Sequence, residues 1–243
     1  MSARGTPQPC MGGPPWPPLW QVVQVSGGAA TEGRPYRYST GTRKVVDETL
    51  RSELLEMRDA DQAVRAELAA DGSLFEGYHP KMEEMHRRNA ERLAEIIEEY
   101  CWPGLSLAGA DGSKAAWMIA HHAIGMPEFQ KRCLRLLTQA AADKDIPAWQ
   151  PAFFEDRIRM FENRLQLYGT QYDWDENGEM KPWPIEDEEH VDDRRRAIGL
   201  GPLAENTAGM QEGVRLEDQQ PPRDWALRRR QFDDWARKTG WRD

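Results

Sequence analysis

Five consecutive segments between residues 47 and 164 carry apolar residues at helical spacing, and this periodicity constrains the fold more than any other feature. It predicts helices over residues 47–70, 81–100, 114–124 and 127–142, and a fifth helix that opens at Pro147. Pro127 and Pro147 suit first helical turns, where no amide donor is needed. Trp102-Pro103-Gly104 stops the second helix, and we read residues 106–112 as a turn-rich connector. The pattern predicts a mainly α protein, a compact bundle of about five to six helices.

After Arg164 the periodicity changes to alternation, which predicts one β-hairpin over residues 166–184. Asn177-Gly178 is typical of a two-residue type I′ turn. That turn would pair Tyr172 with Trp183, Trp174 with Lys181 and Glu176 with Glu179. The outgoing strand would then place four side chains on one face: Gln166, Tyr168, Thr170 and Tyr172.

The two ends of the chain differ in composition from its middle. Residues 1–42 are rich in Gly and Pro and predict a disordered tail. We expect a single helical domain over residues 43–205, with a short charged helix over 187–198, and a linker over 206–222. Residues 223–243 predict a basic, Trp-containing amphipathic C-terminal helix that docks on the acidic domain or on a protein partner.

Charge and cysteine content exclude several classes of protein. The formal net charge of −9 disfavours nucleic-acid binding, because most of the surface would repel a phosphate backbone. No window approaches the roughly 18 consecutive apolar residues of a membrane span, and no secretory signal is recognisable. The three cysteines, Cys10, Cys101 and Cys133, form no Cys-x-x-Cys pair. We therefore expect a soluble cytoplasmic protein that binds neither nucleic acid nor membrane.

His122 is the strongest catalytic candidate, because it follows the apolar run 115–120 and would be held on a rigid helix. Asp156 on the fifth helix would orient the imidazole, and Arg157 would clamp an anionic group. Structural alternatives stay open for all three: a buried, hydrogen-bonded histidine, and a salt bridge between helices. His121 points about 100° away on a helix, so we place it at the surface or rim.

The hairpin supplies neutral polar groups that would line a pocket. Gln166, Tyr168 and Thr170 would present donors and acceptors to a polar small molecule or peptide. The alternative is a polar face that is open to water.

Four motifs occur in a fixed order: Trp102-Pro103, His122-Ala123, Asp156-Arg157 and Gln166-Leu-Tyr-Gly-Thr-Gln171. In this order the chain resembles a bacterial family catalogued as a domain of unknown function, DUF6624, over residues 46–205. The resemblance implies motif positions and no activity. It adds Gln171 to the ligand contacts, and it extends to four polar residues of the first two helices: Gln62, Arg65, Asn89 and Arg92.

No cofactor motif survives inspection. Asp173-x-Asp175-x-Asn177-Gly178 resembles the start of a calcium loop, but Pro184 occupies the position of the bidentate Glu. The five histidines show no zinc-binding spacing, and no glycine-rich dinucleotide loop is present. We therefore expect no metal and no cofactor, and an oxygen-rich metal site assembled from residues distant in the sequence stays open.

Two functions follow from these residues. The first is a small cofactor-independent enzyme that uses acid–base catalysis on a polar metabolite or peptide. The alternative is a non-catalytic protein-binding or immunity-type module. The enzyme hypothesis requires His122, Asp156 and residues 166–171 to surround one cavity.

Overall fold

The computed structural model describes residues 46–75 and 78–243; the expected tail over residues 1–42 lies outside them. The described part is mainly α-helical with one antiparallel β-hairpin, which confirms the predicted fold class. The elements are α1 (Glu48–Ala70), α2 (Pro80–Tyr100), α3 (Leu105–His122), α4 (Pro127–Ala142), α5 (Trp149–Phe161), β1 (Tyr172–Trp174), β2 (Met180–Pro182), α6 (Val191–Ala197), α7 (Leu203–Leu216) and α8 (Trp225–Lys238).

The first five helices follow the predicted order, and α3 differs most from the prediction. It begins at Leu105, so the expected connector over 106–112 is helical, with a kink at Gly109. The reason is a tertiary contact: the Asp145 carboxylate accepts hydrogen bonds from the backbone N–H and the hydroxyl of Ser106. These bonds stabilise the first turn of a segment whose Gly and Ser content by itself favours a loop.

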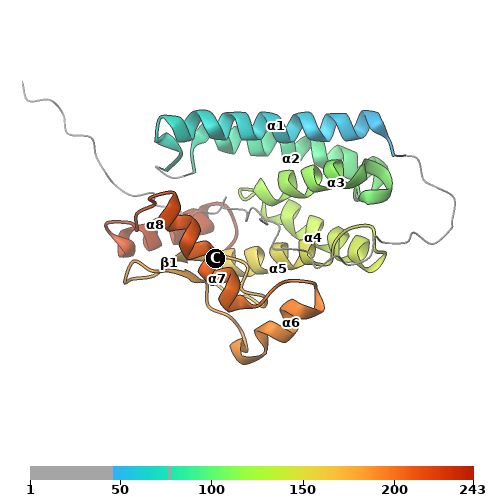
Figure 1. The fold of residues 1–243 in the computed structure, drawn as a ribbon. Helices are drawn as coiled ribbons and strands as arrows, with labels where there is room; N and C mark the ends of the chain where they lie inside the picture. Colours follow the sequence, from blue (N-terminus) through green and yellow to red (C-terminus); the bar gives the residue numbers. More distant parts are fainter. Residues whose placement is uncertain (1–45, 76–77) are drawn as a thin grey trace, which may run out of the picture.

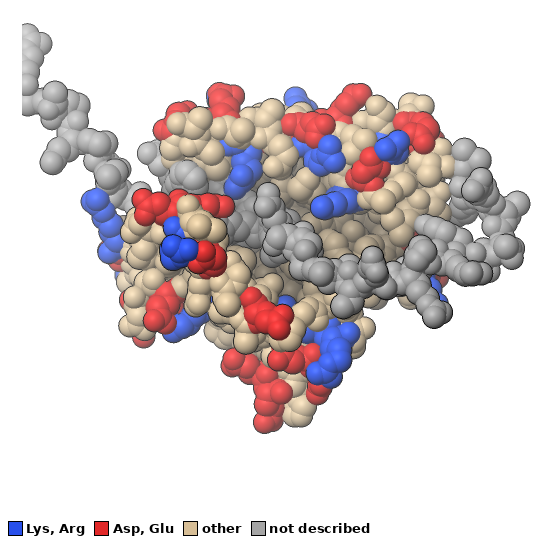
Figure 2. Space-filling view, viewed as in Figure 1, with Lys and Arg blue, Asp and Glu red and all other residues tan. Residues whose placement is uncertain are grey.

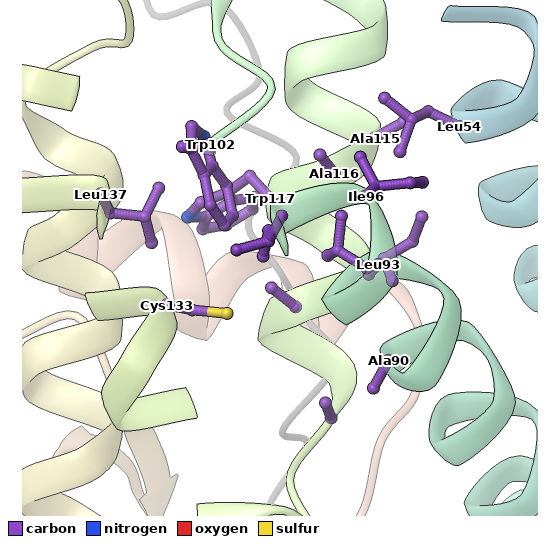
Figure 3. Packing of buried hydrophobic residues seen from close by; sticks show 14 of the residues in the cluster. Leu54, Ala90, Leu93, Ile96, Trp102, Ala115, Ala116, Trp117, Cys133 and Leu137 are labelled. Atoms are coloured by element: carbon purple, nitrogen blue, oxygen red, sulfur yellow. The ribbon is translucent and has the colours of Figure 1, made fainter. Parts of the chain in front are cut away.

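Helices α1 and α2 lie side by side as one layer, with α3 beneath them and α4 and α5 below (Figure 1). Side chains from α2, α3 and α4 meet in the main core, where Trp117, Leu137, Cys133 and Leu93 are buried together (Figure 3). Acidic and basic side chains are interspersed over the outer surface of the α1–α2 layer (Figure 2). The chain therefore separates an apolar interior from a solvated outer layer, as the periodicity predicted.

The hairpin forms, but its predicted register is wrong by one residue. Tyr172 pairs with Pro182, Asp173 with Lys181 and Trp174 with Met180. Gly178 N–H donates to Asp175 C=O, and Gly178 has φ 76°. The connection is thus a three-residue loop with glycine in the left-handed position, instead of a two-residue turn.

The one-residue difference moves side chains to opposite faces of the hairpin. Tyr172 packs with Trp174, Met180 and Val214, whereas Trp183 packs in a different cluster with Phe232. The predicted contact between Tyr172 and Trp183, and the pocket wall that it would form, are therefore absent from the described structure.

Residues 166–171 are not a strand. They form a loop in which Gly169 has φ 65°, and a Cβ there would lie 2.6 Å from Leu203 Cδ1. Much of the predicted linker over 206–222 is also regular, because α7 spans Leu203–Leu216. Both differences come from packing, since α7 and the loop contact each other.

The C-terminal helix α8 docks on the chain's own core. Phe232 and Ala236 pack with Ile158 and Phe161 of α5. Trp241 Nε1 donates a hydrogen bond of 2.7 Å to Ile124 C=O, just after α3. The sequence left open whether this helix docks on the acidic domain or on a protein partner, and the structure shows α8 docked on the domain.

Among the described residues, no helix combines the length and the apolar content that crossing a membrane would need.

Candidate functional site

Three ionisable side chains from three helices meet in the interior. Asp61 of α1 lies between the imidazoles of His86 on α2 and His122 at the end of α3. Asp61 Oδ1 is 3.1 Å from His122 Nδ1, and Asp61 Oδ2 is 3.0 Å from His86 Nε2. The two imidazole rings are 5.2 Å apart between centroids. One carboxylate thus contacts two histidines, one with each oxygen.

Tyr78, just before α2, extends this cluster. Its hydroxyl lies 2.8 Å from His86 Nδ1, and its ring packs edge-on against Trp235 of α8. Four side chains therefore form a continuous polar chain, Tyr78–His86–Asp61–His122. We call the set Asp61, His86 and His122 the DHH cluster.

The DHH cluster is enclosed. Asp61 is 2% exposed, His122 7% and His86 8%. Burial works to raise the pKa of Asp61, but the charge and hydrogen bond of His122, together with the close approach of His86, outweigh it, so this pKa lies well below its usual range. Burial lowers the pKa of His86, because the interior disfavours the imidazolium form. An ionised carboxylate therefore faces a neutral imidazole.

Sequence reasoning found His122 but missed Asp61 and His86. A signal existed, because both residues interrupt apolar stripes. Asp61 continues the spacing of Leu50, Leu54 and Leu68 on the buried face of α1. His86 lies on the buried face of α2 in the same way. A carboxylate or imidazole inside such a stripe is buried by the packing of the helix, which is costly unless it has partners.

Three of the four expected ligand contacts on α1 and α2 lie beside the DHH cluster. Gln62 Nε2 donates to Asp61 Oδ1 at 3.0 Å, and Asn89 Nδ2 donates to Met57 C=O, which ties α2 to α1. Arg65 lies one turn beyond Asp61 and is attracted to it. Arg92 is the exception, because it forms surface ion pairs with Glu53 and Glu95.

Asp156 does not pair with His122, so the expected orienting role passes to Asp61. The Asp156 carboxylate is fully buried and accepts hydrogen bonds from the 166–171 loop: from the backbone N–H groups of Leu167, Tyr168 and Thr170, and from the Thr170 hydroxyl. Burial raises the pKa of Asp156, opposed by these bonds. Its geometry is that of an anchor for a loop.

The other loop residues belong to the same anchor. Gln166 Nε2 donates to the carbonyl groups of Gln171 and Trp183, and Gln166 Oε1 accepts from Gln171 N–H. Gln171 Nε2 donates to the Thr170 hydroxyl, and Tyr168 is half-buried. The polar side chains of Gln166, Thr170 and Gln171, which we expected to line a pocket, thus form hydrogen bonds that fix the conformation of the loop.

Arg157 connects the loop to α3. It is fully enclosed, donates from Nη1 to His121 C=O at 2.7 Å and from Nε to Gln171 Oε1, and burial lowers its pKa to about 9. His121, expected at the surface, is 1% exposed and stacks on Trp117. His122, Asp156 and residues 166–171 consequently form two networks joined through Arg157, instead of surrounding one cavity.

The DHH cluster has the residue types that bind metal ions. One ligand atom from each side chain lies within 4.8 Å of the others. A second group in the described residues also meets this distance, Asp187, Glu189 and His190, but all three are exposed. Two imidazoles with one carboxylate suit divalent transition metals.

The comparison with protein-family models matches residues 48–217 to a family of unknown function, DUF6624. The chain belongs to this family, and the matched range includes the whole DHH cluster and the 166–171 loop. No curated protein and no solved structure matches the chain.

Proposed function

We propose that this chain is an enzyme that acts on a polar metabolite or peptide, with the DHH cluster as its catalytic centre. This centre replaces the one that the sequence hypothesis required, because Asp61 and not Asp156 contacts His122, and Asp156 binds the 166–171 loop instead. The observation that carries the proposal is the burial of one carboxylate and two imidazoles, contributed by three helices, in mutual contact. Burying ionisable groups together costs free energy, and such arrangements concentrate at functional sites.

His122 is the member of the cluster that faces substrate. Its Nδ1 is occupied by Asp61, which fixes the orientation of the ring. Its second ring nitrogen, Nε2, is then the atom that would exchange a proton with substrate, so we place the substrate on the Nε2 side of His122.

The test is a thermal-shift screen of polar metabolites and short peptides, followed by mass spectrometry of each stabilising compound after incubation with the protein. We expect at least one compound to be converted. His122→Asn should abolish conversion and keep the fold, while His190→Asn, at the exposed histidine, should change neither.

The non-catalytic alternative makes a different prediction. A binding module would retain its ligand unchanged, and stabilisation by that ligand would survive His122→Asn. Acid–base chemistry at His122 and activation of water by a bound cation would use the same side chains, so this screen tests the site and not the choice between them.

We also infer a bacterial, cytoplasmic setting. The reasons are the acidic composition, the absence of paired cysteines from the sequence and the resemblance of residues 46–205 to a bacterial family.

A further inference from the structure

Two buried atoms of the DHH cluster approach each other without forming a hydrogen bond. Asp61 Oδ2 and His86 Nε2 are 3.0 Å apart, yet neither has a hydrogen-bond partner among the described residues. The distance suits a hydrogen bond, so the angle is what fails. A carboxylate oxygen and a ring nitrogen that are buried without a hydrogen-bond partner reduce the stability of the folded protein.

A metal ion resolves this geometry. Coordination requires lone pairs that converge on a common point, instead of a donor aimed along the line to its acceptor. With bonds of about 2.0–2.2 Å, neighbouring nitrogen and oxygen ligands of one ion lie roughly 3 Å apart. The separation of 3.0 Å between Asp61 Oδ2 and His86 Nε2 agrees with that spacing, and the hydrogen-bonded pair of Asp61 Oδ1 and His122 Nδ1, at 3.1 Å, is close enough for both to bind the same ion.

The surroundings of His86 also fit a ligand. The Tyr78 hydroxyl lies 2.8 Å from His86 Nδ1. Histidine ligands generally donate the N–H of their second nitrogen to an oxygen, which fixes the ring and leaves the first nitrogen with its lone pair. When Tyr78 accepts that bond, His86 Nε2 faces the Asp61 carboxylate as a bare lone pair, and a cation between them removes the repulsion.

We propose that Asp61, His86 and His122 bind one divalent transition-metal ion, of the zinc, iron(II) or manganese(II) class. Three protein ligands leave a coordination position for water or substrate, as in catalytic sites and unlike closed structural ones. The metal would act as a Lewis acid and activate a bound water. The site rests on the same side chains as the proposed function, but its test reads metal binding and not turnover.

The experiment is cobalt(II) titration of the full chain after treatment with a chelator, followed by visible absorption, together with elemental analysis of protein purified without chelator. We expect one equivalent of cobalt(II) per chain, with a saturable d–d spectrum. His86→Gln and His122→Asn should abolish this spectrum, and circular dichroism checks that each variant is folded. Tyr78→Phe should retain it with an affinity that is about 10–100-fold lower.

The exposed group supplies the matched control. Asp187→Asn removes a ligand from Asp187, Glu189 and His190, and it should leave the cobalt spectrum and stoichiometry unchanged. The proposal is wrong if the folded wild-type chain binds no cobalt(II) and contains no metal, or if the spectrum survives in folded His86→Gln and disappears in Asp187→Asn. Metal binding without conversion of any compound would contradict the proposed function but support the metal site.

Discussion

Asp156→Asn should destabilise the protein without acting directly on the DHH cluster. One Asp156 oxygen accepts from Leu167 N–H at 2.6 Å, and the other accepts from the Thr170 N–H and hydroxyl at 3.0 and 2.9 Å. Asparagine keeps one oxygen and replaces the other with a donor. The least costly orientation keeps the bond to Leu167, lets the Thr170 hydroxyl turn to accept, and leaves the Thr170 N–H without an acceptor.

The magnitude follows from that orientation. One buried backbone donor loses its partner, which costs about 1–3 kcal/mol, and the bonds that remain lose the negative charge of their acceptor. We expect the free energy of unfolding to fall by about 2–4 kcal/mol. For a chain of this size, 1 kcal/mol corresponds to roughly 2–4 °C in melting temperature.

Urea denaturation followed by tryptophan fluorescence measures the change, and cobalt(II) titration checks the DHH cluster. Asp193→Asn is the control, because Asp193 pairs with Arg196 at the surface and its loss should leave the midpoint almost unchanged. Unchanged stability combined with lost activity in Asp156→Asn would refute the anchoring role and return Asp156 to the catalytic one.

Three further substitutions test the packing around the site. Gly169→Ala should lower stability by about 2–4 kcal/mol in a urea titration, because φ is 65° and the new Cβ would clash with neighbouring side chains; an unchanged midpoint would contradict the loop geometry. Arg228→Met leaves Asp173, 2.5 Å from it, buried without its direct ion-pair partner, and should cost about 3–5 kcal/mol. Burial already raises the pKa of Asp173, and losing Arg228 raises it further above the unfolded value. The loss of stability should therefore be larger near pH 8, where Asp173 is ionised, than near pH 5. Equal losses of stability at the two pH values would argue against this ion pair. Trp241→Phe removes the hydrogen bond to Ile124 and should lower the melting temperature by the equivalent of about 1–2 kcal/mol, with no shift if α8 does not dock there.

The sequence by itself determined the order of the first five helices, although it missed the first turns of α3 and most of α7. Apolar spacing is a local property of each segment, so α4 was predicted from Pro127 to Ala142 as observed, and α1 and α2 nearly so. It also singled out His122 as the strongest catalytic candidate, because an imidazole next to an apolar run stands out. The hairpin was predicted as an element for the same local reason.

Tertiary structure decided how these elements use their polar residues. Asp61 and His86 are distant from His122 in the chain, and no spacing rule connects a carboxylate on one helix to imidazoles on two others. The sequence of residues 166–171 alternates in the way typical of a strand. The Asp156 carboxylate, however, accepts hydrogen bonds from backbone N–H groups of this segment and stabilises it as a loop. The hairpin register was decided by which residue adopts the left-handed conformation, and both Asn177 and Gly178 tolerate it. In each case several local conformations are close in free energy, and contacts made only in the folded chain select one.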